Sequence, residues 1–268
     1  MTSYVPLSAA DLIIAATLIA LNGAISFAYG LKLEKSLAIA SLRMIVQLAL
    51  VAVVLRFIFA QTSAWWTLLF AAVMAVAAGI EIVMRQERRF LGWRAMLVSS
   101  SPAFAAGLLT TFIAIAVIQP SPWYAPRFLL PILGMLVGNA LSGVALVLDA
   151  MTTAANRERS AIEARLALGQ SRFSAFEDIL RRSLRTGLMP ILNQMAAAGI
   201  VSLPGMMTGQ ILAGVDPVEA AKYQVMIMFL IAGATSVAVL AGGLAAVHLL
   251  TDERHRLRLD RLRKPALE

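Results

Sequence analysis

Seven runs of mainly apolar residues divide the chain, and each is about as long as a helix that crosses a lipid bilayer. They cover residues 9–30, 37–60, 64–84, 96–118, 128–151, 188–213 and 222–250. Bilayer hydrocarbon needs about 20 apolar residues per helical span, and it offers no partner to open backbone groups. Charged residues make up 14% of the chain, against about 25% in soluble domains. The sequence therefore predicts an all-α polytopic membrane protein with about seven transmembrane helices.

We expect one transmembrane domain over residues 1–268, with cytoplasmic helices over 156–187 and a basic cytoplasmic tail over 251–268. The first apolar run has no basic flank before it, which indicates a retained span and not a cleaved signal. The chain contains no cysteine. This excludes a disulfide framework and a thiolate metal site.

The basic residues predict the orientation in the membrane. Of 23 Lys and Arg residues, 19 fall in the connections 30–37, 85–95 and 152–187 and in the tail. Seven spans place all four segments on one side, and basic residues favour the cytoplasmic side. We therefore expect the N-terminus outside and the C-terminus inside a plasma membrane, the inner membrane of a bacterium. The net charge of +8 is then explained by a basic cytoplasmic surface that faces anionic lipid. It does not indicate binding to nucleic acid.

The long cytoplasmic connection predicts two helices joined by a glycine turn. Ser160 with Glu163 and Ser174 with Glu177 have the spacing of capping boxes, which mark helix starts. Gly169 stands where a left-handed residue ends a helix. We expect helices over 161–168 and 175–187. The second has one apolar face, so a helix lying on the lipid headgroups is an alternative interpretation.

Part of this connection resembles the EAA loop of ABC transporter permeases. The shared positions are Glu163 and Ala164, Gly169 after four more residues, and Ile179 after nine more. Arg165 stands where a second Ala is usual, and the usual Leu-Pro after the Ile is missing. The resemblance implies helices that dock into a separate ATP-binding subunit. It assigns this coupling role to the following residues: Glu163, Ala164, Gly169, Phe173, Phe176 and Ile179.

Three longer segments closely resemble the FetB-type (UPF0014) family of iron-export permeases. They are "SLRMIVQLALVAVVL" (41–55), "PILGMLVGNALSGVAL" (131–146) and "GIVSLPGMMTGQILAGVDPVEAAKYQVMIMF" (199–229). Plant members of the family are linked to aluminium tolerance and to UDP-glucose movement. The resemblance implies the permease subunit of an ABC exporter. Its cargo would be iron or another metal, or alternatively a larger solute such as a nucleotide sugar or a metal chelate.

The chain cannot supply its own ATPase through a phosphate loop, because no G-x-x-x-x-G-K-[ST] motif and no Gly-Lys pair occur. We therefore expect that the chain is not an enzyme and binds no cofactor. ATP and Mg would be held by a separate ABC ATP-binding subunit, present in two copies. A small pathway favours a second copy of the permease in a two-fold dimer. A non-transporting receptor or assembly protein is an alternative. An intramembrane enzyme is disfavoured, because H-E-x-x-H and G-x-S-x-G are both absent.

The stretch "SLPGMMTGQ" (202–210) predicts a break in the sixth span. Pro204 lacks an amide donor and Gly205 loosens the next turn, and transporters use such breaks at substrate sites. We predict that Pro204, Gly205, Met206, Met207 and Gln210 line or gate the pathway. The alternative is a kink packed among neighbouring helices.

Polar residues inside other spans are further pathway candidates. Arg43 and Gln47 lie one turn apart in the second span, Glu81 lies near the inner end of the third, and Asn139 lies in the fifth. An ion pair between Arg43 and Glu81 is the structural alternative. For a metal, Met206, Met207 and Glu81 are weak candidate ligands; thioethers suit Cu(I) better than iron, and methionine is also an ordinary gap filler.

Overall fold

The computed structural model describes residues 8–60, 63–85, 90 and 92–262, and the side chains of these except 83 and 93–99. The described residues form helices α1 to α9 and a final 3₁₀ turn, η1. Their bounds are α1 Ala9–Ala28, α2 Glu34–Phe59, α3 Ala64–Met84, α4 Trp93–Ile118, α5 Pro126–Arg157, α6 Arg159–Ala167, α7 Arg172–Ala197, α8 Gly205–Leu212, α9 Pro217–Leu250 and η1 Leu259–Arg261.

The predicted all-α polytopic class is confirmed. Six helices of the described part are long and apolar enough to cross a membrane, namely α1, α2, α3, α4, α5 and α9. They match six of the seven predicted spans. The remaining one, 188–213, is not a single helix, because α7 ends at Ala197 and α8 begins at Gly205.

The chain divides into two compact units, Met1–Thr62 and Ser63–Glu268. In the first unit, α1 packs against α2. Ser8 and Asp11 form a capping box at the start of α1. The buried Ser26 hydroxyl donates to Glu34 over 2.8 Å and so fixes the turn between the two helices. The single domain predicted over 1–268 stays a prediction.

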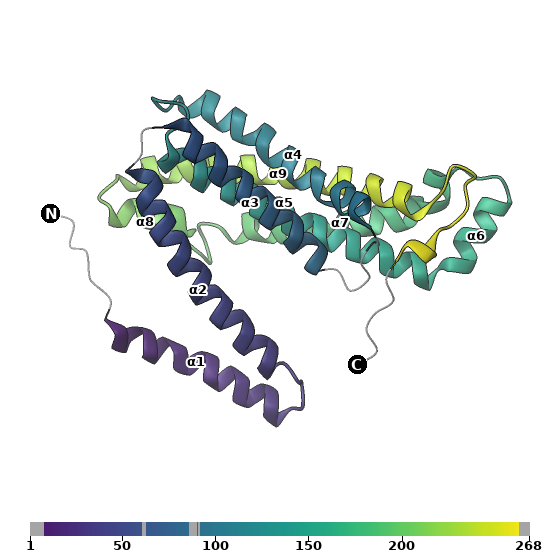
Figure 1. The fold of residues 1–268 in the computed structure, drawn as a ribbon, viewed down its shortest axis with the longest axis horizontal. Coiled ribbons are helices and arrows are strands. Elements are labelled where there is room, and N and C mark those ends of the chain that lie inside the picture. The colour runs from purple at the N-terminus through teal and green to yellow at the C-terminus, as the bar shows by residue number, and fades with distance from the viewer. Residues whose placement is uncertain (1–7, 61–62, 86–89, 91, 263–268) are drawn as a thin grey trace. The chain divides into compact units, whose positions relative to one another are not determined.

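The second unit is built around α5 and α9, which pack against each other and against α4 and α7. Figure 1 shows α6 at one end of this unit and α8 at the other. The first buried apolar cluster is formed by the helix ends that we predicted to be cytoplasmic. Its members include Ile82, Met151, Phe176 and Leu250. The second buried apolar cluster is formed by the opposite ends of these helices and includes Ala114, Ile132 and Ile227. Consecutive helices of this unit therefore alternate in direction between the two clusters. The orientation of the chain and the side that faces the cytoplasm stay predictions.

Glycines let three helices of this unit approach closely. A Cβ atom added to Gly187 of α7 would lie 2.9 Å from the backbone oxygen of Gly143 in α5. A Cβ atom on Gly243 of α9 would lie 2.8 Å from Leu180 of α7. Small residues at such contacts allow helix backbones to pack against each other in membranes. The middle of α7 is therefore tightly packed against α5 and α9.

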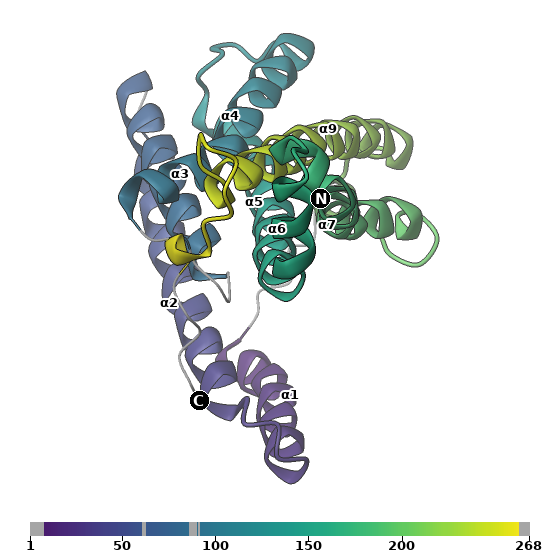
Figure 2. The ribbon, with the colours of Figure 1, turned by 90° about the vertical axis from the view of Figure 1, so that its right-hand side faces the viewer.

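The C-terminal segment is an ordered hook, although the sequence predicts only a basic tail. Residues 251–262 turn back after α9, and Leu262 pairs with Phe90 in an antiparallel bridge. Figure 2, viewed from the end that carries α6, shows this segment in yellow across the helix ends. The Arg261 guanidinium donates to the carbonyl oxygens of Leu249 and Thr251 at 3.0 and 3.2 Å. Basic groups favour the carbonyl end of a helix, so Arg261 caps α9.

Acidic side chains hold the hook together. Hydrogen bonds from the Arg258 guanidinium lower the pKa of Asp260 to about 2. The pKa of Asp252 is also lowered, mainly by a hydrogen bond from the backbone of Arg256. The basic residues Arg88, Arg89, Arg263 and Lys264, which we used to predict topology, lie outside the described residues.

Candidate functional site

The α6–α7 elbow, residues 159–182, has the helix–glycine–helix form predicted from the sequence. Gly169 adopts a φ of +85°. Its amide donates to the oxygen of Leu166 at 3.0 Å, and the amide of Gln170 donates to Arg165 at 3.1 Å. These two bonds are the Schellman pattern, which requires a left-handed residue after the helix. Gly169 therefore sets the angle at which α7 leaves α6.

Both predicted capping boxes are wrong. Ser160 lies inside α6, which starts at Arg159 directly after α5; Glu163 instead pairs with Arg159 at 2.8 Å. Helix α7 starts earlier than predicted because Ser171, and not Ser174, is its N-cap. The Ser171 hydroxyl accepts from the Ser174 amide at 3.2 Å.

Polar contacts join α6 and α7 across the elbow. The Arg165 guanidinium donates to Asp178 at 3.0 Å and to the carbonyl oxygen of Ala175 at 3.4 Å. The departure from the EAA pattern at Arg165 therefore supplies a cross-link between the two helices. Phe176 and Ile179 are buried in the apolar cluster beneath.

The turn of the elbow is its most open part. Leu168, beside Gly169, is 83% exposed, and Ala164 and Glu163 are exposed on α6. Phe173 is 38% exposed and packs edge to face on His248 at the end of α9, with ring centroids 5.1 Å apart. Of the six predicted coupling residues, Glu163, Ala164, Gly169 and Phe173 therefore lie at the surface, whereas Phe176 and Ile179 support it from below. Their coupling role stays a prediction.

The break in the sixth predicted span is a loop and not a kink. Helix α7 ends at Ala197, residues 198–204 are not helical, and Pro204 is the N-cap of α8. Gly199 has a φ of +83°, and its amide donates to the oxygen of Ser202 at 2.9 Å. A left-handed glycine directly after the C-cap residue ends α7, and Pro204, which has no amide donor, stands where α8 begins.

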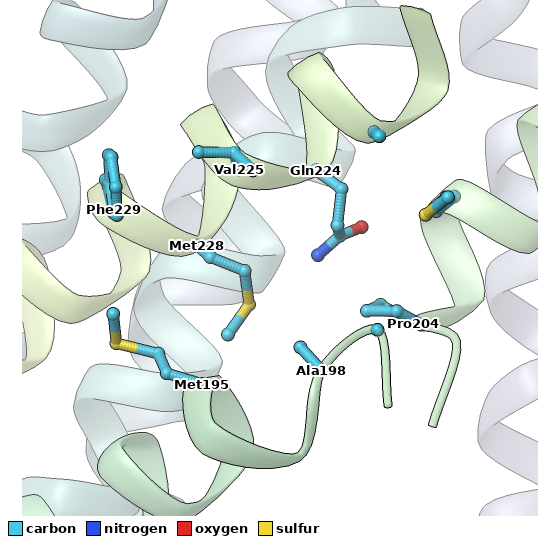
Figure 3. Close-up of a pocket in the computed structure, with 10 residues that line it drawn as sticks. Met195, Ala198, Pro204, Gln224, Val225, Met228 and Phe229 are labelled. Carbon is cyan, nitrogen blue, oxygen red and sulfur yellow. The ribbon is translucent and has the colours of Figure 1, made fainter. Parts of the chain in front are cut away.

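A pocket of about 290 Å³ lies where this loop meets α7, α8 and α9. We call it the methionine-lined pocket. Its walls are Met195, Ala198, Gly199, Pro204, Met207, Ala221, Gln224, Val225, Met228 and Phe229. Figure 3 shows the Gln224 amide directed from α9 into the space beside Met228, Ala198 and Pro204.

Gln224 is the polar side chain of this pocket. It is 8% exposed, and its Oε1 atom is buried without a hydrogen-bond partner in the structure. Leaving a buried acceptor unpaired costs about 1–3 kcal/mol. Polar groups in that state are uncommon and call for a bound partner or a functional reason. Gln224 and Met195 were not predicted from the sequence, although a single Gln inside the apolar run 222–250 was a visible signal.

The structure separates the predicted pathway residues. Pro204 and Met207 line the methionine-lined pocket, whereas Gly205, Met206 and Gln210 do not. Met206 instead packs against the second apolar cluster. Asn139 donates to the Met135 carbonyl oxygen of its own helix at 2.8 Å.

The remaining pathway candidates lie in both units. Arg43 and Gln47 belong to α2 in the first unit, so their link to Glu81 stays a prediction. Glu81 forms an ion pair with Arg85, the C-cap residue of the same helix, at 3.3 Å. In the described part of the chain, no three His, Asp or Glu side chains gather in a way that could hold a metal ion.

One helix connects the elbow and the pocket. Helix α7 runs without interruption from Arg172 to Ala197. At 1.5 Å per residue, Met195 in the pocket wall lies about 35 Å along the axis from Arg172. The elbow and one wall of the pocket therefore belong to the same helix, with Pro190 between them.

Comparison with known proteins gives one consistent family. The family described as "Uncharacterised protein family (UPF0014)" matches residues 9–250. The chain is 36% identical over 205 residues to a UPF0014 membrane protein of Synechocystis, covering 75% of this chain and 78% of that protein. It is 33% identical over 223 residues to the UPF0014 membrane protein STAR2 of rice, covering 83% and 76%.

A further relative carries a functional name. The "Probable iron export permease protein FetB" of Escherichia coli is 32% identical over 234 residues, covering 87% of this chain and 88% of that protein. No solved structure shows a significant match.

Proposed function

This chain belongs to the UPF0014 family, and on that premise we propose that it is the membrane-spanning permease subunit of an ABC transporter. The chain has no phosphate loop of its own, so a separate ABC subunit would hydrolyse ATP. Two copies of that subunit and a second copy of this chain complete the proposed assembly. The setting is the bacterial inner membrane, with the N-terminus outside and the C-terminus in the cytoplasm.

The continuity of α7 is the observation that carries this proposal. A permease must convert a movement at its ATPase contact into a change at its transport site. The exposed turn at Leu168 and Gly169 offers the contact, and the Arg165–Asp178 ion pair joins it to α7. The same helix reaches Met195 in the methionine-lined pocket. One helix that forms part of both sites is the physical link through which we propose that they are coupled.

We propose a metal ion, with iron first, as the exported cargo. The support is the name of the E. coli relative, a probable iron export permease. A larger solute is the second candidate, and it is favoured by the apolar walls and the volume of the pocket.

Transport by inside-out membrane vesicles tests the proposal. Vesicles that hold both this chain and its ATPase should accumulate radiolabelled iron when ATP is added. Vesicles with only one of the two proteins are the controls and should not accumulate it. Accumulation without the ATPase would contradict the ABC assignment. ATP hydrolysis that this chain stimulates, with no iron movement, would contradict iron as cargo.

A further inference from the structure

We infer that the methionine-lined pocket binds an uncharged aromatic solute that carries one hydrogen-bond donor. This inference goes beyond the proposed function, because it concerns binding by the chain alone, with or without an ATPase. Three properties of the pocket support it: its size, its single polar group and its sulfur-bearing walls.

The volume of the pocket suits a small organic molecule. An apolar protein cavity of about 150 Å³ holds one benzene ring, and this pocket has about 290 Å³. Two fused rings therefore match the space. The ten lining residues carry no charged side chain, and placing an uncompensated charge among apolar groups is strongly unfavourable. Size and lining thus favour a neutral ligand of about ten non-hydrogen atoms.

Gln224 specifies the polar part of the ligand. Among the side chains that line the pocket, Gln224 alone carries nitrogen or oxygen, and its Oε1 atom has no partner. A lipid acyl chain would fill the space but leave this acceptor unpaired. An N–H or O–H group on an otherwise apolar ligand satisfies the acceptor.

The sulfur atoms favour an aromatic ligand over an aliphatic one. Met195, Met207 and Met228 come from three different helices, α7, α8 and α9, so thioethers surround the space. Figure 3 shows the Met195 and Met228 side chains on the same side of the pocket as Phe229. Thioether sulfur makes favourable contacts with aromatic rings, and the flexible methionine chain adapts to ligand shape.

Indole and indene make the test, because both are fused two-ring molecules of similar size and shape and only indole has an N–H donor. Binding is measured by saturation-transfer NMR with the full chain in lipid nanodiscs. We expect indole to bind at least ten-fold more tightly than indene. The Gln224→Met variant keeps the side-chain length but removes the acceptor, and it should lower the affinity for indole about ten-fold while that for indene stays the same.

Gln210→Met is the matched control. Gln210 also has a buried Oε1 without a partner, but it does not line the pocket, so its variant should keep the preference for indole. Equal binding of indole and indene to the unmodified chain would overturn the inference. So would an unchanged preference in Gln224→Met. Silver ion binding that Met207→Leu abolishes, with no indole binding, would instead identify a thioether metal site.

Discussion

The close contact between α7 and α5 gives a prediction whose size follows from the structure. In Gly187→Ala, the new Cβ atom would lie 2.9 Å from the Gly143 oxygen, 3.0 Å from Val239 Cγ1 and 3.3 Å from Val147 Cβ. The first neighbour is backbone, and valine side chains are stiff at χ1. Relief therefore requires α7 to move away from α5. Overpacking of this kind costs about 1–3 kcal/mol.

Gly138→Ala is the matched control on α5, because nothing lies within 4 Å of its added Cβ atom. Both glycines are helical, so both variants gain a similar helix propensity of about 1 kcal/mol. This gain cancels in the comparison. The difference between the variants is then the packing cost alone.

Thermal unfolding of the two variants in the same detergent measures this difference. For a domain of 150–250 residues, each kcal/mol shifts the melting temperature by roughly 2–4 °C. The Gly187→Ala protein should therefore melt about 2–12 °C below Gly138→Ala. Equal melting temperatures, or a more stable Gly187→Ala protein, would refute the close packing of α7.

Three further predictions concern the elbow, the hook and the topology. Arg165→Met removes an ion pair whose partners are both substantially exposed, so we expect a loss of about 0.2–1 kcal/mol in thermal unfolding; a loss above about 3 kcal/mol, typical of a broken buried pair, would contradict this. The pKa of Asp260 is lowered to about 2 in the folded chain, below its ordinary value of about 3.9, so its stabilisation of the hook is complete above pH 4 and is lost as pH falls towards 2. The anisotropy of a fluorophore on Glu253→Cys should fall in that window, and a fall between pH 7 and 5 would contradict the assignment. A reporter active only in the cytoplasm should be silent before Tyr4, which lies outside the described residues, and active after Glu268; an active N-terminal fusion would remove one span from the topology.

The helices were predictable because membrane burial leaves a strong signal. Uninterrupted apolar runs gave six spans, with ends that differ from those of the structure by a few residues. The left-handed turn at Gly169 was also predictable, since few other residues adopt a positive φ there. Cap choice was not, because Ser160, Ser171 and Ser174 are chemically alike. In the structure α6 begins at Arg159, directly after α5, and α7 begins at Arg172, so Ser160 and Ser174 both lie inside helices.

The candidate pocket was predicted only in part. Pro204 and Met207 were found from the predicted break in the sixth span, which in the structure is a loop between α7 and α8 and not the kink that was the alternative. Gln224 and Met195 come from other helices, and only folding brings them to the same space. The hook was missed because its charges are prominent in the sequence. Its apolar residues Leu257, Leu259 and Leu262 were the available signal: Leu262 belongs to the first buried apolar cluster, and Leu257 and Leu259 pack against it.

Docking of the elbow on an ATPase is the central claim, and stimulation of ATP hydrolysis tests it most directly. Gly169→Val places a branched residue at a φ of +85°, which is strained. Gly30→Val is the matched control, since Gly30 also has a positive φ, of +63°, with nothing close to its added Cβ atom, but lies outside the elbow.

Both variants are reconstituted with the partner ATPase, and ATP hydrolysis is compared with that of the unmodified chain. We predict that Gly169→Val loses binding and stimulation of the ATPase while Gly30→Val keeps both. Normal stimulation by Gly169→Val, or equal loss in the two variants, would contradict coupling through the elbow.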